Sequence, residues 1–320
     1  MDKAGVLISI HHIIGDAWTA GLIVNGIMDI YESLINTNQL NEDKSFSYLN
    51  YINSEKEYLN SPKFEKDAEF WNSIFDSIPI TAEIPSKKRL ISKNNIEYKS
   101  MRNEYVISKD LVTKINKFCK ENGISIFNFF MGIFAIYASK TSGLNDFVIG
   151  SPILNRTNFK EKQTTGMFIS TIPYRIKLDS NITFSDFVKN LGKQSMQIFR
   201  HQKYPYQNIL QDLRKIDPHV PNLYDFLISY QNIRSDKQTN TINYEAKWFA
   251  NGNVSDSFNV HLYDMNDIGS LNIAYDYQIN KYTSKDIANM HLRILEMIDE
   301  VLTNSSILLK DINILSKEDL

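Results

Sequence analysis

Apolar residues recur along the chain in two spacings, one typical of strands and one typical of helices. Gly5–His12 is a short run of Val, Leu and Ile that ends at a turn, and it predicts a buried strand. Beyond the turn, apolar residues recur at helical spacing and predict a helix over about Thr19–Leu34. The next two helices are expected over about Ser47–Leu59 and Ser61–Ser77.

The second part of the chain mixes strands with helices. Pro79–Asn95 has weak periodicity and suits a crossover between two lobes. Short apolar runs predict strands at Tyr105–Ile107, Asp146–Gly150, Ser170–Ile176, Tyr224–Gln231, Phe258–Tyr263 and Leu271–Tyr277. Helical spacing and capping residues predict helices at Ser108–Asn122, Ile126–Ala138, Phe184–Phe199 and Ser284–Leu302. Strands interspersed with helices indicate a layered α/β fold.

Composition narrows the class of protein. Apolar residues make up 42% of the chain and charged residues 22%, the balance of a soluble globular protein. A net charge of −2 argues against a nucleic-acid partner and against an anionic membrane surface. The apolar stretch Ile126–Ala138 is too short to span a bilayer. Cys119 is the single cysteine, which excludes an intrachain disulfide and favours a cytoplasmic location.

The stretch SIHHIIGDAW, at Ser9–Trp18, concentrates the candidate chemistry. Neighbouring strand residues point to opposite faces, so His11 and His12 should not share one cavity. The chain offers no cysteine cluster and no strand or helix spacing of metal ligands here, so we expect no metal site. An imidazole at a strand end, beside the turn residue Asp16, suits a general base or a hydrogen-bonding group. On these residues alone, two structural core histidines are the commoner alternative.

The same stretch resembles the HHxxxDG signature of the condensation domains of nonribosomal peptide synthetases. His11, His12 and Asp16 are in place, and Ala17 stands where the family has Gly. Further segments resemble family motifs in the family's order: YLNYI (Tyr48–Ile52), Glu69-Phe70-Trp71, GSPILNRT (Gly150–Thr157), TGMFISTIPYR (Thr165–Arg175), HQKYPYQ (His201–Gln207) and DFLISYQN (Asp225–Asn232). The resemblance therefore covers nearly the whole chain.

The resemblance implies an α/β fold like that of chloramphenicol acetyltransferase, with two lobes and a tunnel between them. Such domains join a carrier-bound aminoacyl or peptidyl thioester to the amine of a downstream carrier-bound aminoacyl thioester. The implied partners are the donor and acceptor peptidyl carrier domains and a neighbouring adenylation domain. The implied cofactor is the phosphopantetheine of the carrier domains, and none is bound by the chain itself.

The resemblance also implies roles for individual residues. It places His12 in the tunnel, as a base or a positioning group, and makes His11 its structural neighbour. Asp16 is implied to hold the turn through a charge-assisted bond to an arginine, which family members carry in a segment before the signature. Backbone amides near Gly15 are candidates for holding the oxyanion. The other substrate-binding candidates are Trp18, Ser170 and Thr171.

The resemblance begins almost at Met1, whereas family members carry most of a first lobe before the signature. We therefore expect residues 1–85 to be a remnant of the N-terminal lobe and residues 86–320 to be the C-terminal lobe. We also expect the chain alone to form no peptide bond. Two alternatives stay open: a non-catalytic remnant that only binds carrier domains, and a free-standing acyltransferase that uses a soluble amine or alcohol.

Overall fold

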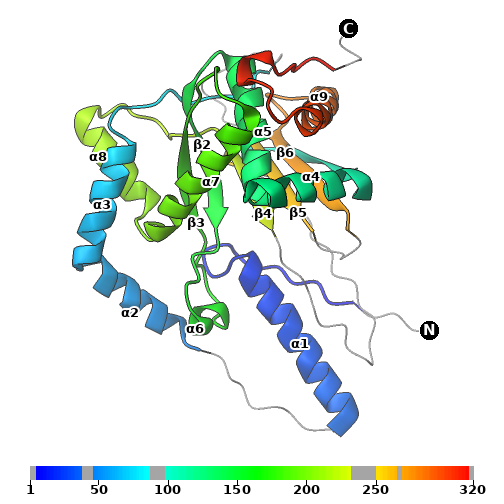
Figure 1. The fold of residues 1–320 in the computed structure, drawn as a ribbon. Coiled ribbons are helices and arrows are strands. Elements are labelled where there is room, and N and C mark those ends of the chain that lie inside the picture. Colours follow the sequence, from blue (N-terminus) through cyan, green and yellow to red (C-terminus); the bar gives the residue numbers. More distant parts are fainter. Residues whose placement is uncertain (1–4, 38–45, 87–97, 232–249, 265–268, 317–320) are drawn as a thin grey trace. The chain divides into compact units, whose positions relative to one another are not determined.

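The computed structural model describes residues 5–37, 46–86, 98–231, 250–264 and 269–316 (Figure 1). Their contacts divide the chain into two units, each built from segments that are distant in the sequence. The first unit comprises Met1–Lys66, Ile153–Ser170 and Ile233–Lys247. The second comprises Asp67–Pro152, Thr171–Asn232 and Trp248–Leu320. The lobe boundary between residues 85 and 86 stays a prediction.

Among the described residues, the strands form one six-stranded mixed sheet in the order β1-β6-β5-β4-β2-β3. Strand β6 pairs antiparallel with β1 and β5, whereas β4 runs parallel to β5 and β2. The six predicted strands of the second part of the chain are all present. Their bounds are β1 (Ser100–Ile107), β2 (Asp146–Ile153), β3 (Ser170–Lys177), β4 (Phe226–Gln231), β5 (Phe258–Tyr263) and β6 (Leu271–Gln278).

The helices follow the predicted apolar spacing closely. Their bounds are α1 (Ala17–Thr37), α2 (Tyr48–Leu59), α3 (Pro62–Ile74), α4 (Lys109–Asn122), α5 (Ile126–Ser142), α6 (Phe159–Lys162), α7 (Phe184–Arg200), α8 (Tyr206–Ile216) and α9 (Ser284–Thr303). Helices α6 and α8 were not predicted from the sequence. Ser108 caps α4 by accepting a hydrogen bond from the Leu111 N–H, and Gly123 ends the helix with a φ of 64°.

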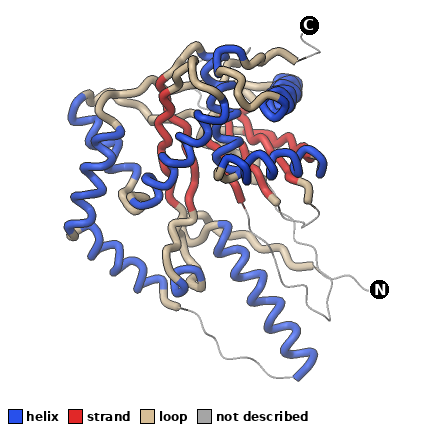
Figure 2. Tube along the Cα trace, viewed as in Figure 1, coloured by secondary structure: helices blue, strands red, loops and turns tan. Residues whose placement is uncertain are grey.

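Helices α4, α5, α7 and α9 contact one another and lie on one face of the sheet (Figure 2). Helix α5 is buried along nearly its whole length and packs on β4, while α9 packs on β1. The sheet residues beneath them are large and apolar, because alternate strand positions face the same side. They include Phe226, Ile228, Phe258, Val260 and Tyr275, each no more than 1% exposed.

The opposite face of the sheet carries a line of polar side chains that crosses the sheet from β4 to β1. The Ser229 hydroxyl lies 2.7 Å from His261 Nδ1, and His261 Nε2 lies 3.2 Å from Asp276. Two nitrogens of Arg102 donate to the two Asp276 carboxylate oxygens at 2.7 and 2.6 Å. The hydrogen bonds compensate the burial of these charges, and the pKa of Asp276 falls to about 2.

The predicted strand over Gly5–His12 is wrong. Gly5–Ile10 has no regular secondary structure, and a turn begins at His12. A strand needs a neighbour that pairs with its N–H and C=O groups. Gly5–Ile10 pairs with no strand of the described residues, and the side chains of Val6 and Leu7 are 74% and 84% exposed.

No single helix of the described ranges is long and apolar enough to cross a membrane. Helices α4 and α5 are long and apolar enough only when taken together, and their axes are bent by 101°.

Candidate functional site

The candidate site is built around the turn that precedes α1. The Ile14 N–H donates to the His11 carbonyl at 3.1 Å and closes the turn. The Asp16 carboxylate accepts from the Thr19 N–H at 2.8 Å, and the Asp16 carbonyl accepts from the Ala20 N–H at 3.1 Å. Asp16 is therefore the N-cap of α1, and it fixes the direction in which the helix leaves the turn.

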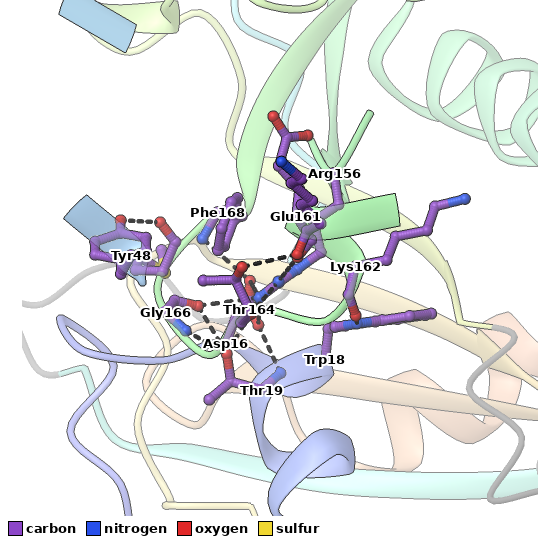
Figure 3. A network of polar contacts seen from close by, with 12 residues as sticks. Asp16, Trp18, Thr19, Tyr48, Arg156, Glu161, Lys162, Thr164, Gly166 and Phe168 are labelled. Carbon is purple, nitrogen blue, oxygen red and sulfur yellow. Dashed lines mark hydrogen bonds and ion pairs between the residues drawn. The ribbon is translucent and has the colours of Figure 1, made fainter. Parts of the chain in front are cut away.

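Arg156 reaches the same carboxylate from the segment between β2 and β3 (Figure 3). Its Nη2 lies 3.1 Å from Asp16 Oδ1 and 3.3 Å from Oδ2, and both side chains are wholly inaccessible to solvent. The same nitrogen also donates to the Thr19 hydroxyl at 3.2 Å and to the Gly166 carbonyl at 3.1 Å. The pair thus joins the start of α1 to a segment that lies 140 residues away in the chain.

Thr19 and Gly166 exchange two hydrogen bonds beside this ion pair. The Thr19 hydroxyl donates to the Gly166 carbonyl at 2.7 Å and accepts from the Gly166 N–H at 3.0 Å. The Phe168 N–H donates to Asp16 Oδ2 at 3.1 Å. As Figure 3 shows, backbone groups of residues 166–168 and the Arg156 guanidinium converge on the first turn of α1.

The electrostatics of the pair favour a charged Asp16. Burial alone would raise the pKa of Asp16, because it penalises the charged form. The Thr19 and Phe168 N–H groups and the charge of Arg156 act in the opposite direction. Together they hold the pKa of Asp16 below its ordinary value. The carboxylate is therefore ionised at neutral pH and its charge is compensated within the site.

An aromatic ring covers the Arg156 guanidinium. Its central carbon lies 3.8 Å from the centre of the Phe168 ring, a cation–π contact. Phe168 in turn packs on Tyr51 and Tyr48, with ring centres 4.1 and 5.3 Å apart. Only glycine fits at position 166, because a Cβ atom there would collide with the Tyr48 ring. These contacts exclude water from the ion pair.

Arg156 also fastens the loop that contains α6. Its Nη1 donates to the carbonyls of Glu161 and Thr164, on both sides of the loop. The indole N–H of Trp18 donates to the Lys162 carbonyl at 2.8 Å. Trp18, predicted to bind substrate, is half-buried and holds this loop through that hydrogen bond.

The two histidines lie on the turn, and both are exposed. His11 Nδ1 accepts from the Ile13 N–H at 3.2 Å, a local contact that stabilises the turn. Because these residues do not form a strand, the two side chains need not point to opposite faces, as had been predicted. The catalytic roles of His11, His12 and Asp16 stay predictions.

The charge-assisted bond expected for Asp16 is present, but its arginine is not where the resemblance put it. The partner is Arg156, in the GSPILNRT stretch, and not a residue of a segment before the signature. This stretch was recognisable as a motif, but the sequence did not link its arginine to Asp16. The signal was an arginine close to the apolar residues Ile153 and Leu154, because a buried arginine must find a partner.

The other predicted residues are divided between the two units. Gly15 is buried in the first unit, where a Cβ atom would lie 3.0 Å from the Thr19 methyl group. Ser170, also of the first unit, begins β3 and is half-buried. Thr171 belongs to the second unit, where it hydrogen-bonds the Tyr224 hydroxyl. Within the described part of the chain, no group of three His, Cys, Asp or Glu side chains is arranged to hold a metal ion.

Comparison with known proteins identifies the family. Residues 2–319 match the family model of the condensation domain. The chain is 33% identical over 308 residues to surfactin synthase subunit 1 of Bacillus subtilis (strain 168), an alignment that covers 96% of this chain and 8% of that protein. It is 23% identical over 322 residues to gramicidin S synthase 2 of Brevibacillus brevis, covering 99% of this chain and 7% of that protein. The chain thus spans less than a tenth of the length of these two relatives.

Solved structures show the same fold at low sequence identity. The first condensation domain of the calcium-dependent antibiotic synthetase, in complex with a substrate analogue, has a TM-score of 0.76 and 14% identity. That match covers 96% of this chain and 68% of the other. A four-domain nonribosomal peptide synthetase bound to AMP and glycine has a TM-score of 0.77 and 16% identity, covering 96% of this chain and 24% of the other. The predicted α/β fold, like that of chloramphenicol acetyltransferase, is confirmed, and the chain belongs to the condensation-domain family.

Proposed function

We propose that this condensation domain forms an amide bond between two substrates carried as thioesters. The donor is an aminoacyl or peptidyl group on an upstream carrier domain, and the acceptor is an aminoacyl group on a downstream one. The proposal is supported by family membership and by relatives that are named as synthases of surfactin and gramicidin S. A neighbouring adenylation domain would supply the activated amino acid, and the phosphopantetheine arms would belong to the carrier domains.

The reaction places definite demands on the site. The acceptor nitrogen attacks the thioester carbonyl, the C–N bond forms, and the C–S bond breaks with departure of the thiol. The nitrogen must lose a proton, and the leaving sulfur must gain one. Thioesters are already activated, so placing the amine correctly supplies much of the acceleration. We propose that His12 takes the proton or orients the amine.

The observation that carries the proposal is the buried Asp16–Arg156 pair. The pair fixes the residue at which the turn ends and α1 begins, four positions after His12. In this view Asp16 has a structural role and does not exchange protons with substrate. His11 holds the turn through its contact with the Ile13 N–H.

The remaining roles follow from the chemistry of the groups. A backbone amide near Gly15 would stabilise the negative charge that develops on the thioester oxygen. The hydroxyl groups of Ser170 and Thr171 would hydrogen-bond the substrates, and the Trp18 ring would add an apolar surface. We propose no metal and no cofactor bound by the chain itself.

The experiment that tests the function supplies the full protein with one carrier domain loaded with a donor and one loaded with an acceptor. Mass spectrometry of the acceptor carrier reports the product. The proposal predicts that the acceptor gains the mass of the donor acyl group through an amide that survives mild base. Release of free donor acid, with no gain on the acceptor, would instead indicate a hydrolase.

A further inference from the structure

The α6 loop presents an aromatic side chain that the fold does not use. Phe159 is 72% exposed, and its ring meets only one other described ring, that of Phe46, edge-on at 6.5 Å. Lys160 and Lys162 follow it in the same short helix and are also exposed. Neither lysine forms an ion pair with another described residue. The loop therefore carries an exposed hydrophobic group next to two lysines, neither of which pairs with a described acidic residue.

The backbone beneath this aromatic group is firmly held. Arg156 donates to the carbonyls of Glu161 and Thr164, and Trp18 donates to that of Lys162. The Glu161 carboxylate accepts from the Thr157 N–H and hydroxyl, and Asn158 caps α6. An exposed aromatic residue on a rigid support costs little conformational entropy when it binds a partner, which is the property of an interface anchor.

We propose that Phe159, Lys160 and Lys162 form a docking surface for a carrier domain that bears phosphopantetheine. This inference rests on the proposed function and names where one of its partners binds. Charge complementarity supports this assignment. Every loaded carrier has a phosphodiester anion on its surface, at the serine that holds the arm. Two lysines attract that anion, and the phenyl ring packs on the apolar surface beside it.

The binding test uses the full protein and a fluorescently labelled carrier domain, with and without its phosphopantetheine. Fluorescence anisotropy gives the dissociation constant. Phe159→Ser and the double variant Lys160→Glu/Lys162→Glu should each weaken binding of the phosphopantetheinylated carrier by roughly tenfold or more. The controls are Ile216→Ser, at a side chain that is 70% exposed, and Lys114→Glu, at an exposed lysine. Both controls should bind within twofold of the parent.

Three results would overturn the proposal. The first is that the Phe159 and lysine variants bind the carrier as tightly as the parent. The second is that the parent binds the carrier equally well without phosphopantetheine. The third is that Phe159→Ser abolishes self-association in sedimentation and leaves carrier binding unchanged. The docking surface would then bind a second copy of this chain.

A second readout separates this inference from the proposed function. Donor thioesters of N-acetylcysteamine bypass the carrier, so the ratio of kcat/KM for carrier-bound to free thioester reports docking alone. We expect Phe159→Ser to lower that ratio about tenfold. An unchanged ratio would refute the docking surface while condensation stands. If the parent condenses neither form, the proposed function fails and the anisotropy titration still decides the docking surface.

Discussion

At the residue scale, the buried ion pair is the most constrained feature of the candidate site. Removing one charge from a wholly buried pair leaves the other without compensation. Arg156 would keep its hydrogen bonds to carbonyl groups, but none of these carries a full negative charge. Loss of either partner of the buried pair should therefore lower the free energy of unfolding strongly. Loss of one partner of an exposed pair, such as Lys117–Glu121, should lower it little.

Asp16→Asn should lower the free energy of unfolding by about 3 kcal/mol, because it leaves the Arg156 charge buried and unpaired. Urea denaturation followed by circular dichroism measures this change. The control Glu121→Gln removes a charge from the exposed Lys117–Glu121 pair and should cost about 0.5 kcal/mol or less. A loss below about 1 kcal/mol for Asp16→Asn would contradict the structural role given to the pair.

His291 makes stability depend on pH. It is buried, stacks on Tyr105 and lies 2.9 Å from the Tyr275 hydroxyl, and burial lowers the pKa of His291 to about 4. In the unfolded chain His291 has its ordinary pKa near 6.5, so between pH 6.5 and 4 it binds a proton there but stays neutral in the folded chain. This contribution to stability is therefore present above pH 6.5 and is lost as the pH falls toward 4. The pKa of Asp256, raised to about 6 by burial and by Asp225, acts in the opposite direction.

Comparison of the parent with His291→Phe isolates the histidine. Between pH 6 and 4, the parent's free energy of unfolding should fall more steeply than that of the variant, by up to about 1.4 kcal/mol per pH unit, the slope for one proton. The exposed His219, changed to Ala, serves as the control. Equal slopes for parent and His291→Phe would show that His291 is not buried in its neutral form.

At the scale of elements, local sequence predicted the helices well and one strand badly. Helix α4 was predictable because Ser108 and Gly123 mark its ends and its apolar residues recur at helical spacing. Gly5–His12 has the composition of a strand, but strand formation depends on a pairing partner that composition does not reveal. Helix α8 buries Ile209, Leu210 and Leu213 at helical spacing, but it begins inside the HQKYPYQ motif and was not predicted as a helix.

Two glycines of the first unit should respond to alanine in opposite ways. Gly166→Ala brings a methyl group against the Tyr48 ring and should destabilise the protein by about 1–3 kcal/mol. Gly26 lies within α1, and no atom lies within 4 Å of the position that a Cβ atom would take, so Gly26→Ala should stabilise by up to about 1 kcal/mol. Thermal denaturation of both variants tests this. Equal shifts of the melting temperature would contradict the close packing at position 166.

At the scale of the whole molecule, the family was predictable from motifs in order, whereas the site's architecture was not. The motifs carrying Asp16 and Arg156 were both recognisable in the sequence, but their pairing spans 140 residues and depends on the fold. The same limit applies to Thr19 and Gly166, which carry no chemical signal of their own. A motif identifies candidate side chains in the sequence. The contacts that one motif makes with another depend on the fold and could not be predicted.

The central claim is that His12 acts in amide formation on a turn held by Asp16 and Arg156. The most direct test is a single-turnover rate with carrier-bound donor and acceptor, measured in the full protein for the parent, His12→Ala and His219→Ala. Loss of proton transfer or positioning predicts a fall of roughly 10²-fold or more for His12→Ala, with His219→Ala within twofold of the parent. A His12→Ala protein that condenses at the parental rate would remove His12 from the chemistry.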